Sequence, residues 1–270
     1  MRFTIGLAQC CHRQDEDAAA LVARFADEAQ KASVDLLVFP ESLMSPLGES
    51  TQAFFTAAQP LDGPFARAAD AIAARHGLWM VYTVNEANPD GKPFNTAVIV
   101  DDAGVRRGAY RKMHLFDAGD KRESDRMTAG DKLFEPVDTP FGKLGLGVCY
   151  DLRFPEMARS MVLQGADVLF VPAEFPSGNP LPPRTDHWDI LVRSTALYNL
   201  TYVVAANQFG ALHKDNPFGR SCVVDPWGTT VAAASGRQDI VYATLDMEYQ
   251  REIRDKVATW VNRRPEVYAL

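Results

Sequence analysis

The chain has 270 residues, of which 47% are hydrophobic and 23% are charged. This composition is typical of a soluble globular protein that is long enough to bury a large core. Acidic residues outnumber basic residues by 35 to 28, which gives a formal net charge of −7, and the sequence has no basic block. The charge balance therefore argues against nucleic acid or an anionic membrane as the main partner.

The N-terminus and the longest apolar runs bear on the compartment. No apolar run approaches the roughly 18 residues that a membrane-spanning helix requires. The first residues, MRFTIGLAQCCHRQDED, become polar too early for a secretory signal peptide and offer no small-residue cleavage site. We therefore expect a cytoplasmic protein, in which the four cysteines are reduced thiols rather than a disulfide framework.

Short apolar runs and amphipathic segments alternate along the chain. Segment 3–10 (FTIGLAQC) predicts a strand, and segment 16–33 predicts a helix because its apolar residues recur at helical spacing. Segment 34–41 (VDLLVFPE) is apolar until its last two residues, as expected for a central strand covered on both faces. Segment 64–77 begins with proline and ends with glycine, which favours a helix between them.

The second half of the chain continues this alternation. Segment 142–151 (GKLGLGVCYD) predicts another buried strand, and segment 154–166 predicts a helix with a proline near its start. Segment 186–200 predicts a helix that carries several apolar residues, among them Ile190 and Leu197, on one side. The other predicted strands span 78–87, 94–102, 105–113, 167–175, 201–210, 219–228 and 240–247, and a last helix spans 248–260.

The order of these elements predicts an α/β fold in one domain over residues 1–270. We find no internal repeat, no low-complexity segment and no Pro/Gly/Ser linker that would divide the chain. The two halves of the chain have a similar alternation of predicted strands and helices, which suggests two sheets packed on each other with helices outside. A single open sheet of the Rossmann type fits the pattern nearly as well.

Several familiar motifs are absent from the sequence. It has no G-x-S-x-G elbow, no phosphate-binding G-x-x-x-x-G-K-[ST] loop and no H-E-x-x-H zinc motif. GLGVCY at 145–150 lacks the third glycine of a dinucleotide fingerprint, and CCH at 10–12 does not have the spacing of a zinc site. We therefore expect no metal and no nucleotide cofactor.

Three residues with catalytic chemistry stand where predicted strands end. Glu41 closes segment 34–41, Lys112 lies at the end of 105–113, and Cys149 lies at the end of 142–151. Ligands of α/β sheets bind beyond the carboxyl ends of strands, so these three side chains can meet there. Each also has an ordinary interpretation, as a solvated carboxylate, a surface charge or a small core side chain.

The three residue types together fit acyl transfer. A carboxylate can take the proton of an attacking thiol and pass it to a leaving ammonia. A lysine ammonium can stabilise the oxyanion of the tetrahedral intermediate, and the backbone N–H of Tyr150, just after the cysteine, offers a second donor. Cys222 alternates like a strand residue, and we interpret it as structural.

Three segments, LLVFPES, YRKMHLFD and GVCYDLRFPE, resemble the surroundings of the glutamate, lysine and cysteine of the nitrilase superfamily of carbon–nitrogen hydrolases. They occur in the same order, and the sequence similarity extends from IGLAQ near the start to RRPEVY near the end, so the resemblance covers almost the whole chain. It implies a four-layer αββα sandwich, usually a homodimer formed through helices, without a metal or an organic cofactor.

The resemblance also implies roles for individual residues. It makes Glu41 the general base, Lys112 the oxyanion-stabilising lysine and Cys149 the nucleophile, and it places a second, supporting glutamate at Glu123. The implied reaction converts an amide to a thioester with release of ammonia, and water then releases the carboxylic acid.

Within the superfamily the text is most similar to omega-amidases and deaminated-glutathione amidases, which act on small dicarboxylate-derived amides such as 2-oxoglutaramate. In and after the proline-rich loop 173–186, Glu174, Phe175 and His187 are candidates for substrate contact. An acidic Glu174 in the pocket would disfavour an anionic substrate.

Three alternatives stay open at this point. The first is an N-carbamoyl-amine amidohydrolase of the same superfamily. The second is a papain-like hydrolase that pairs Cys149 with His114 or His187. The third is a non-catalytic binding member of the fold, which the intact set of glutamate, lysine and cysteine argues against.

Overall fold

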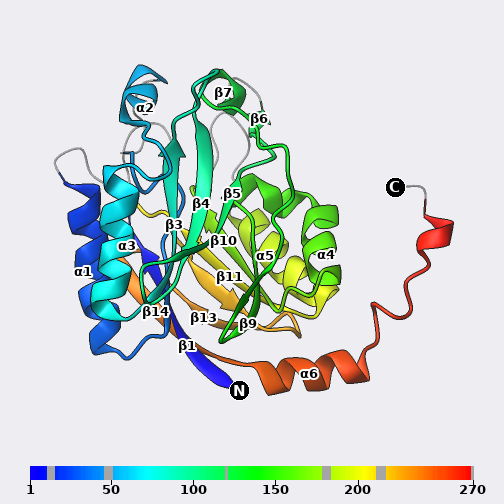
Figure 1. Ribbon diagram of the computed structural model, residues 1–270. Helices are drawn as coiled ribbons and strands as arrows, with labels where there is room; N and C mark the ends of the chain where they lie inside the picture. Colours follow the sequence, from blue (N-terminus) through cyan, green and yellow to red (C-terminus); the bar gives the residue numbers. More distant parts are fainter. Residues whose placement is uncertain (11–15, 46–50, 119–120, 178–183, 211–216, 269–270) are drawn as a thin grey trace.

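Two six-stranded sheets form the centre of the computed structural model, which describes residues 1–10, 16–45, 51–118, 121–177, 184–210 and 217–268 (Figure 1). The first sheet has the order β14 (Asp239–Asp246), β1 (Arg2–Gln9), β2 (Leu36–Val38), β3 (Trp79–Glu86), β4 (Phe94–Val100) and β5 (Arg106–Arg111). The second has the order β13 (Thr230–Ala233), β12 (Cys222–Val224), β11 (Tyr202–Asn207), β10 (Val168–Ala173), β9 (Gly142–Leu146) and β8 (Val137–Thr139).

The two sheets share one strand pattern. In the first, β1, β2 and β3 are parallel, and β4 and β5 continue antiparallel. In the second, β9, β10 and β11 are parallel, and β12 and β13 continue antiparallel. The parallel strands are buried along their length because both faces of each sheet are covered.

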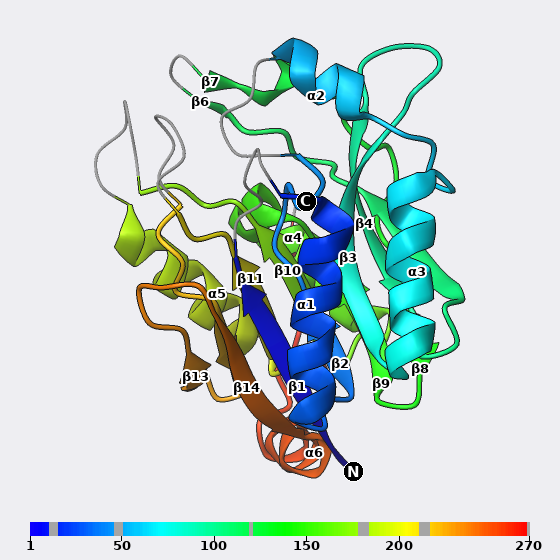
Figure 2. The same ribbon diagram turned by 90° about the vertical axis from the view of Figure 1, so that its left-hand side faces the viewer.

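Helices cover the outer face of each sheet. Helices α1 (Ala18–Lys31) and α3 (Pro64–His76) share one hydrophobic cluster with the outward side chains of the first sheet, and Figure 2 shows them side by side over it. Helices α4 (Pro155–Leu163) and α5 (Thr185–Asn199) contribute to the second cluster, which also fills the space between the sheets. The layers follow the order helix, sheet, sheet, helix, so the predicted four-layer αββα sandwich is confirmed and the single open sheet was wrong.

Local sequence signals explain where the outer helices begin and end. The Asp17 side chain caps α1 by accepting a hydrogen bond from the N–H of Ala19 at 2.7 Å. Helix α3 begins at Pro64 and ends at Gly77, whose φ of 61° is the left-handed conformation that glycine adopts without strain.

Smaller elements complete the chain: α2 (Thr51–Ala57), a hairpin of β6 (Asp117–Ala118) and β7 (Lys121–Arg122), α6 (Met247–Lys256), and the 3₁₀ segments η1 (Glu123–Asp125), η2 (Cys149–Arg153) and η3 (Pro265–Val267). The helix predicted over 248–260 corresponds to α6 and ends at Lys256, four residues earlier than predicted. Within the described residues, none of the helices combines the length and the apolar character needed to cross a membrane.

Two sequence expectations differ from the structure. The strand predicted over 142–151 ends at Leu146. It cannot extend through Cys149, because Cys149 has a φ of 47° and strand residues do not adopt that conformation. On α5, Ile190 and Leu197 lie on the exposed side, while the buried side is formed by other residues, with Trp188 and Val192 at its centre. The apolar stripe read from the sequence is therefore an exposed surface.

Candidate active site

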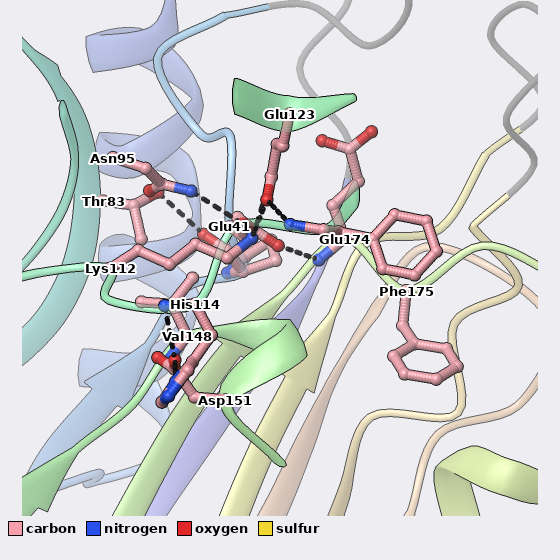
Figure 3. Close-up of polar contacts among 12 residues, drawn as sticks. Glu41, Thr83, Asn95, Lys112, His114, Glu123, Val148, Asp151, Glu174 and Phe175 are labelled. Atoms are coloured by element: carbon pink, nitrogen blue, oxygen red, sulfur yellow. Dashed lines mark hydrogen bonds and ion pairs between the residues drawn. The ribbon is translucent and has the colours of Figure 1, made fainter. Parts of the chain in front are cut away.

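Glu41 follows β2 and lies buried between the two sheets, with 2% of its surface exposed. Its Oε1 accepts hydrogen bonds from Asn95 Nδ2 at 2.7 Å and from Lys112 Nζ at 2.9 Å. Its Oε2 accepts from the backbone N–H of Glu174 at 2.8 Å (Figure 3). The next residue, Ser42, has a φ of 56°, a strained conformation that turns the chain sharply after Glu41. The carboxylate is thus fixed from both sheets.

Lys112 follows β5 and has 1% of its surface exposed. Its Nζ lies 2.9 Å from Glu41 Oε1, 2.8 Å from Glu123 Oε1 and 2.9 Å from Glu123 Oε2. Burial alone would lower the pKa of Lys112, but the charges of Glu123 and Glu41 raise that pKa well above its ordinary value. Lys112 is therefore an ammonium cation held between two carboxylates.

The backbone at Lys112 is braced by a glycine. The N–H of Gly130 donates to the carbonyl oxygen of Lys112 at 2.8 Å. A Cβ at Gly130 would lie 2.2 Å from the carbonyl oxygen of Arg111, so no other residue fits there without moving the strand end. This contact fixes the point at which Lys112 leaves β5.

Cys149 is the first residue of η2, directly after an extended Val148. It is buried, with 8% of its surface exposed, and its φ of 47° places a non-glycine residue in the left-handed region. Burial and the neighbouring charge of Glu41 raise the pKa of Cys149 well above its usual range, while Lys112 opposes the shift. The thiol is therefore protonated at neutral pH.

Asp151 holds the turn that carries Cys149. Its Oδ2 accepts from the N–H of Val148 at 2.8 Å and from the hydroxyl of Tyr110 at 2.9 Å. Its Oδ1 lies 2.7 Å from Nδ1 of His114 (Figure 3). The His114 ring also stacks on another aromatic ring. The buried carboxylate thereby ties the turn to the end of the first sheet.

Neither His114 nor His187 forms a pair with Cys149. The ring of His114 bonds to Asp151, whereas the charged side chains that shift the pKa of Cys149 are Glu41, Lys112 and Glu123. His187 is exposed in the first turn of α5, and its Nδ1 lies 3.3 Å from Nη2 of Arg153. The structure therefore leaves His187 outside the buried cluster and gives the papain-like alternative no support.

The remaining predicted residues lie around the cluster. Glu123 begins η1, and besides Lys112 it binds the N–H of Phe116 through Oε2 at 2.6 Å. Phe175 is buried beyond the end of β10. Tyr150 is half-buried, its ring packs edge-on against Phe116, and its N–H lies in the first turn of η2, where helix geometry supplies no acceptor. The predicted loop 173–186 lies partly outside the described residues.

Glu174 is half-buried beside the cluster. Burial and the charge of Glu41 raise the pKa of its carboxyl from 4.5 to about 7, and a hydrogen bond with Ser42 opposes the shift. This carboxyl group titrates near neutral pH, unlike an ordinary surface glutamate.

Sequence reasoning missed Asn95, Asp151 and a buried arginine, Arg184. The signal for Asn95 was present, because a polar side chain in the apolar segment FNTAVIVDD requires a partner. Among the residues that the structure describes, no group of three or more His, Cys, Asp or Glu side chains is arranged to hold a metal ion.

The four-layer sandwich and the buried glutamate, lysine and cysteine define a hydrolase of the nitrilase type. The family model of the carbon–nitrogen hydrolases matches residues 4–255. The chain therefore belongs to the carbon–nitrogen hydrolase family, and the predicted recognition and the prediction of an enzyme are confirmed.

Individual relatives agree with this assignment. The nitrilase and fragile histidine triad fusion protein NitFhit of Caenorhabditis elegans is 40% identical over 208 residues, which cover 74% of this chain and 46% of NitFhit. Its crystal structure has a TM-score of 0.91 at 33% identity and covers 99% of this chain and 66% of that one. This chain thus spans about half the length of NitFhit.

Two further proteins match over nearly their full length. The deaminated glutathione amidase of Escherichia coli O157:H7 is 32% identical, and the match covers 92% of both chains. The structure of Nit3 of Saccharomyces cerevisiae, a member of branch 10 of the nitrilase superfamily, has a TM-score of 0.85 at 29% identity and covers 99% of this chain and 97% of that one.

Proposed function

We propose that the protein is an amidase that hydrolyses a small linear amide to a carboxylic acid and ammonia through a thioester on Cys149, as omega-amidases do. The buried convergence of Glu41, Lys112 and Cys149 carries this proposal, because it joins a base, a cation and a nucleophile in one water-poor site. The similarity to proteins named deaminated glutathione amidase supports the reaction class.

The first half of the reaction forms the thioester. Cys149 Sγ attacks the amide carbon while Glu41 accepts the thiol proton, which suits a thiol whose pKa is raised by burial and by the neighbouring charge of Glu41. The carbonyl oxygen becomes an oxyanion that Lys112 Nζ and the N–H of Tyr150 stabilise. Glu41 then delivers its proton to the nitrogen, the C–N bond breaks, and ammonia leaves.

The second half repeats these roles with water. Glu41 takes a proton from water, the hydroxyl attacks the thioester carbon, and the same two donors hold the oxyanion. The C–S bond breaks, the thiolate regains the proton from Glu41, and the carboxylic acid departs. Lys112 stays charged throughout because Glu123 continues to neutralise it from the other side.

Ammonia release from a panel of amides tests this function. We expect turnover of at least one member of a set of glutaramate, glutamine analogues, aliphatic amides and carbamoyl amines. Cys149→Ala abolishes the activity, because no nucleophile remains, and keeps the fold. Cys222→Ala is the matched control, since Cys222 is also buried but lies within β12 and is not part of the cluster. Near-wild-type activity of Cys149→Ala would refute the mechanism.

We also propose that the protein acts in the cytoplasm as a single-domain homodimer on a small-molecule amide. An exposed apolar surface on α5 supports self-association, because Ile190 is 59% exposed and Tyr198 is 61% exposed. Sedimentation velocity tests the dimer, and we expect Ile190→Asp to shift the protein toward the monomer. A monomeric wild-type protein at micromolar concentration would contradict this proposal.

A further inference from the structure

Arg184 is a buried arginine that the proposed hydrolysis does not use. It stands directly before α5, and 6% of its surface is exposed. Its Nε donates to the carbonyl oxygen of Pro176 at 3.2 Å. Within the part of the chain that the structure describes, no carboxylate is paired with its guanidinium. A buried cation without a counter-charge is costly, so its position calls for an anionic partner.

Arg184 lies at the wall of the active site. Its guanidinium carbon is 4.6 Å from the ring centre of Phe116 and 5.1 Å from that of Phe175. Phe116 donates its N–H to Glu123, and Phe175 follows the residue whose N–H binds Glu41. Both rings therefore belong to the surroundings of the catalytic cluster, and they present the flat guanidinium between them.

Arg184 lies on the side of the site that carries the nucleophile. Burial and the charge of Arg153 lower the pKa of Arg184, whereas a thiolate at Cys149 raises it. The guanidinium carbon of Arg153 lies 5.7 Å from the ring centre of Phe175, the same ring that Arg184 contacts. Two cations thus converge beside one aromatic ring on the side of the nucleophile.

Glu174 does not neutralise this side. Figure 3 shows its carboxyl group and the ring of Phe175 pointing in different directions, as expected for consecutive residues at a strand end. The charges that shift the pKa of the Glu174 carboxyl group are those of Glu41, Arg126 and Glu123, whereas Arg184 lies against the ring of Phe175. The acidic residue and the buried arginine therefore face different parts of the site.

We propose that Arg184 binds a carboxylate of the substrate, at the end of the molecule remote from the scissile amide, and so selects monoamides of dicarboxylic acids over neutral amides. The planar guanidinium matches a carboxylate with two parallel hydrogen bonds, and the bound anion supplies the missing counter-charge. This inference rests on the proposed amidase function and adds the residue that determines its specificity.

The test compares two substrates that differ in one group. Glutaramate carries a carboxylate where pentanamide carries a methyl group, and the amide is otherwise the same. Arg184→Met removes the charge and keeps an apolar side chain between the two rings. Arg193→Met is the matched control, because Arg193 lies on the exposed side of α5. kcat and KM are measured by ammonia release with the full chain.

We expect the wild type to prefer glutaramate. Arg184→Met should lower kcat/KM for glutaramate by about 10- to 200-fold, mostly through KM, because the lost hydrogen bonds to a charged group exist before the chemical step. Its kcat/KM for pentanamide should change by less than about 3-fold. Arg184→Lys keeps the positive charge but cannot make two parallel hydrogen bonds to a carboxylate, so its kcat/KM for glutaramate should lie between those of the wild type and Arg184→Met. Arg184→Lys replaces Arg184→Met if the methionine variant does not fold.

Equal losses on both substrates in Arg184→Met would show a structural role and overturn the inference. A wild-type enzyme that prefers pentanamide would overturn it as well. If neither amide is hydrolysed, the amidase proposal fails for these substrates, and calorimetric binding of glutarate decides the role of Arg184 separately. Binding to the wild type and to Arg193→Met, weaker binding to Arg184→Lys and none to Arg184→Met would support the anion site, and no difference among these proteins would overturn it.

Discussion

The two sheets bring different kinds of groups to the site. The first sheet and its connections supply Glu41, Lys112 and Glu123, which form a compact set of ion pairs. The second sheet and its connections supply Cys149 on a left-handed residue and, beyond β10, the buried Arg184, which has no carboxylate partner among the residues that the structure describes. On the first side the ion pairs form without a substrate, whereas the second side depends on a fixed backbone turn and carries the arginine proposed to bind the substrate carboxylate. The proposed base and its ion pairs thus lie on one side of the site, and the proposed nucleophile and specificity residue lie on the other.

Replacing the base on the first side should have the largest effect. Glu41→Gln keeps the size of the side chain but cannot accept the thiol proton, so kcat should fall by about 10³- to 10⁴-fold. Glu156→Gln is the control, because Glu156 is an exposed glutamate at the start of α4. Steady-state ammonia release measures both variants, and a loss of less than about 10-fold in Glu41→Gln would remove Glu41 from the role of base.

Removing the charge of Lys112 should destabilise the folded protein, because its ion pairs with Glu41 and Glu123 are lost. Lys112→Met leaves Glu41 and Glu123 buried without their shared counter-charge, which should lower the free energy of unfolding by about 3–5 kcal/mol in urea titrations. The double variant Lys112→Met/Glu123→Gln should recover part of this loss, because one uncompensated charge is gone. If the single variant were as stable as the wild type, the ion pairs would not be essential to this side.

The turn on the second side should be sensitive to Asp151. Asp151→Asn keeps the shape but replaces one of the two acceptor oxygens by an amide nitrogen that cannot accept a hydrogen bond, so the turn loses either the contacts with Tyr110 and Val148 or the contact with His114. The looser turn should lower kcat by about 10- to 100-fold, since small misplacements of a nucleophile are costly. His114→Asn should have a smaller effect, because it leaves the bond to Val148 in place. Unchanged kcat in Asp151→Asn would show that Cys149 is held by other contacts.

Glu174 should give the smallest effect, a change in pH dependence. Its folded pKa of about 7 lies above the ordinary 4.5, so the folded state keeps a proton that the unfolded state loses. Its contribution to stability is therefore full below pH 4.5 and is lost as the pH rises to about 7. The stability of Glu174→Gln relative to the wild type should rise over this range and stay level above it. A constant difference from pH 4.5 to 8 would contradict this account of Glu174.

Much of the fold, and the side of the site that the first sheet supplies, was predictable from the sequence. The apolar segment 34–41 ends in Glu41, the predicted strand 105–113 carries Lys112 near its end, and the resemblance to carbon–nitrogen hydrolases ordered both with Cys149. Periodicity and end signals also located most strands and helices, because burial on both faces leaves continuous apolar runs.

The other side was less accessible to sequence reasoning, for physical reasons. The apolar run of segment 142–151 continues through Val148, so the pattern of apolar residues does not indicate that the next residue, Cys149, adopts a left-handed conformation. Arg184 follows a loop rich in proline, and only the packing of Phe116 and Phe175 shows that it is buried. On α5 the exposed side is as apolar as the buried side, so hydrophobicity alone cannot orient the helix.

Acid-quench mass spectrometry tests the central claim most directly. The wild-type protein is mixed with glutaramate, quenched within the first turnover and digested, and the peptide that contains Cys149 is examined for an acyl group. The mechanism predicts a transient glutaryl thioester on Cys149 that is absent from the Cys149→Ala protein and from the peptide of Cys222. Release of ammonia at the wild-type rate with no acyl group on Cys149 at any quench time would contradict it.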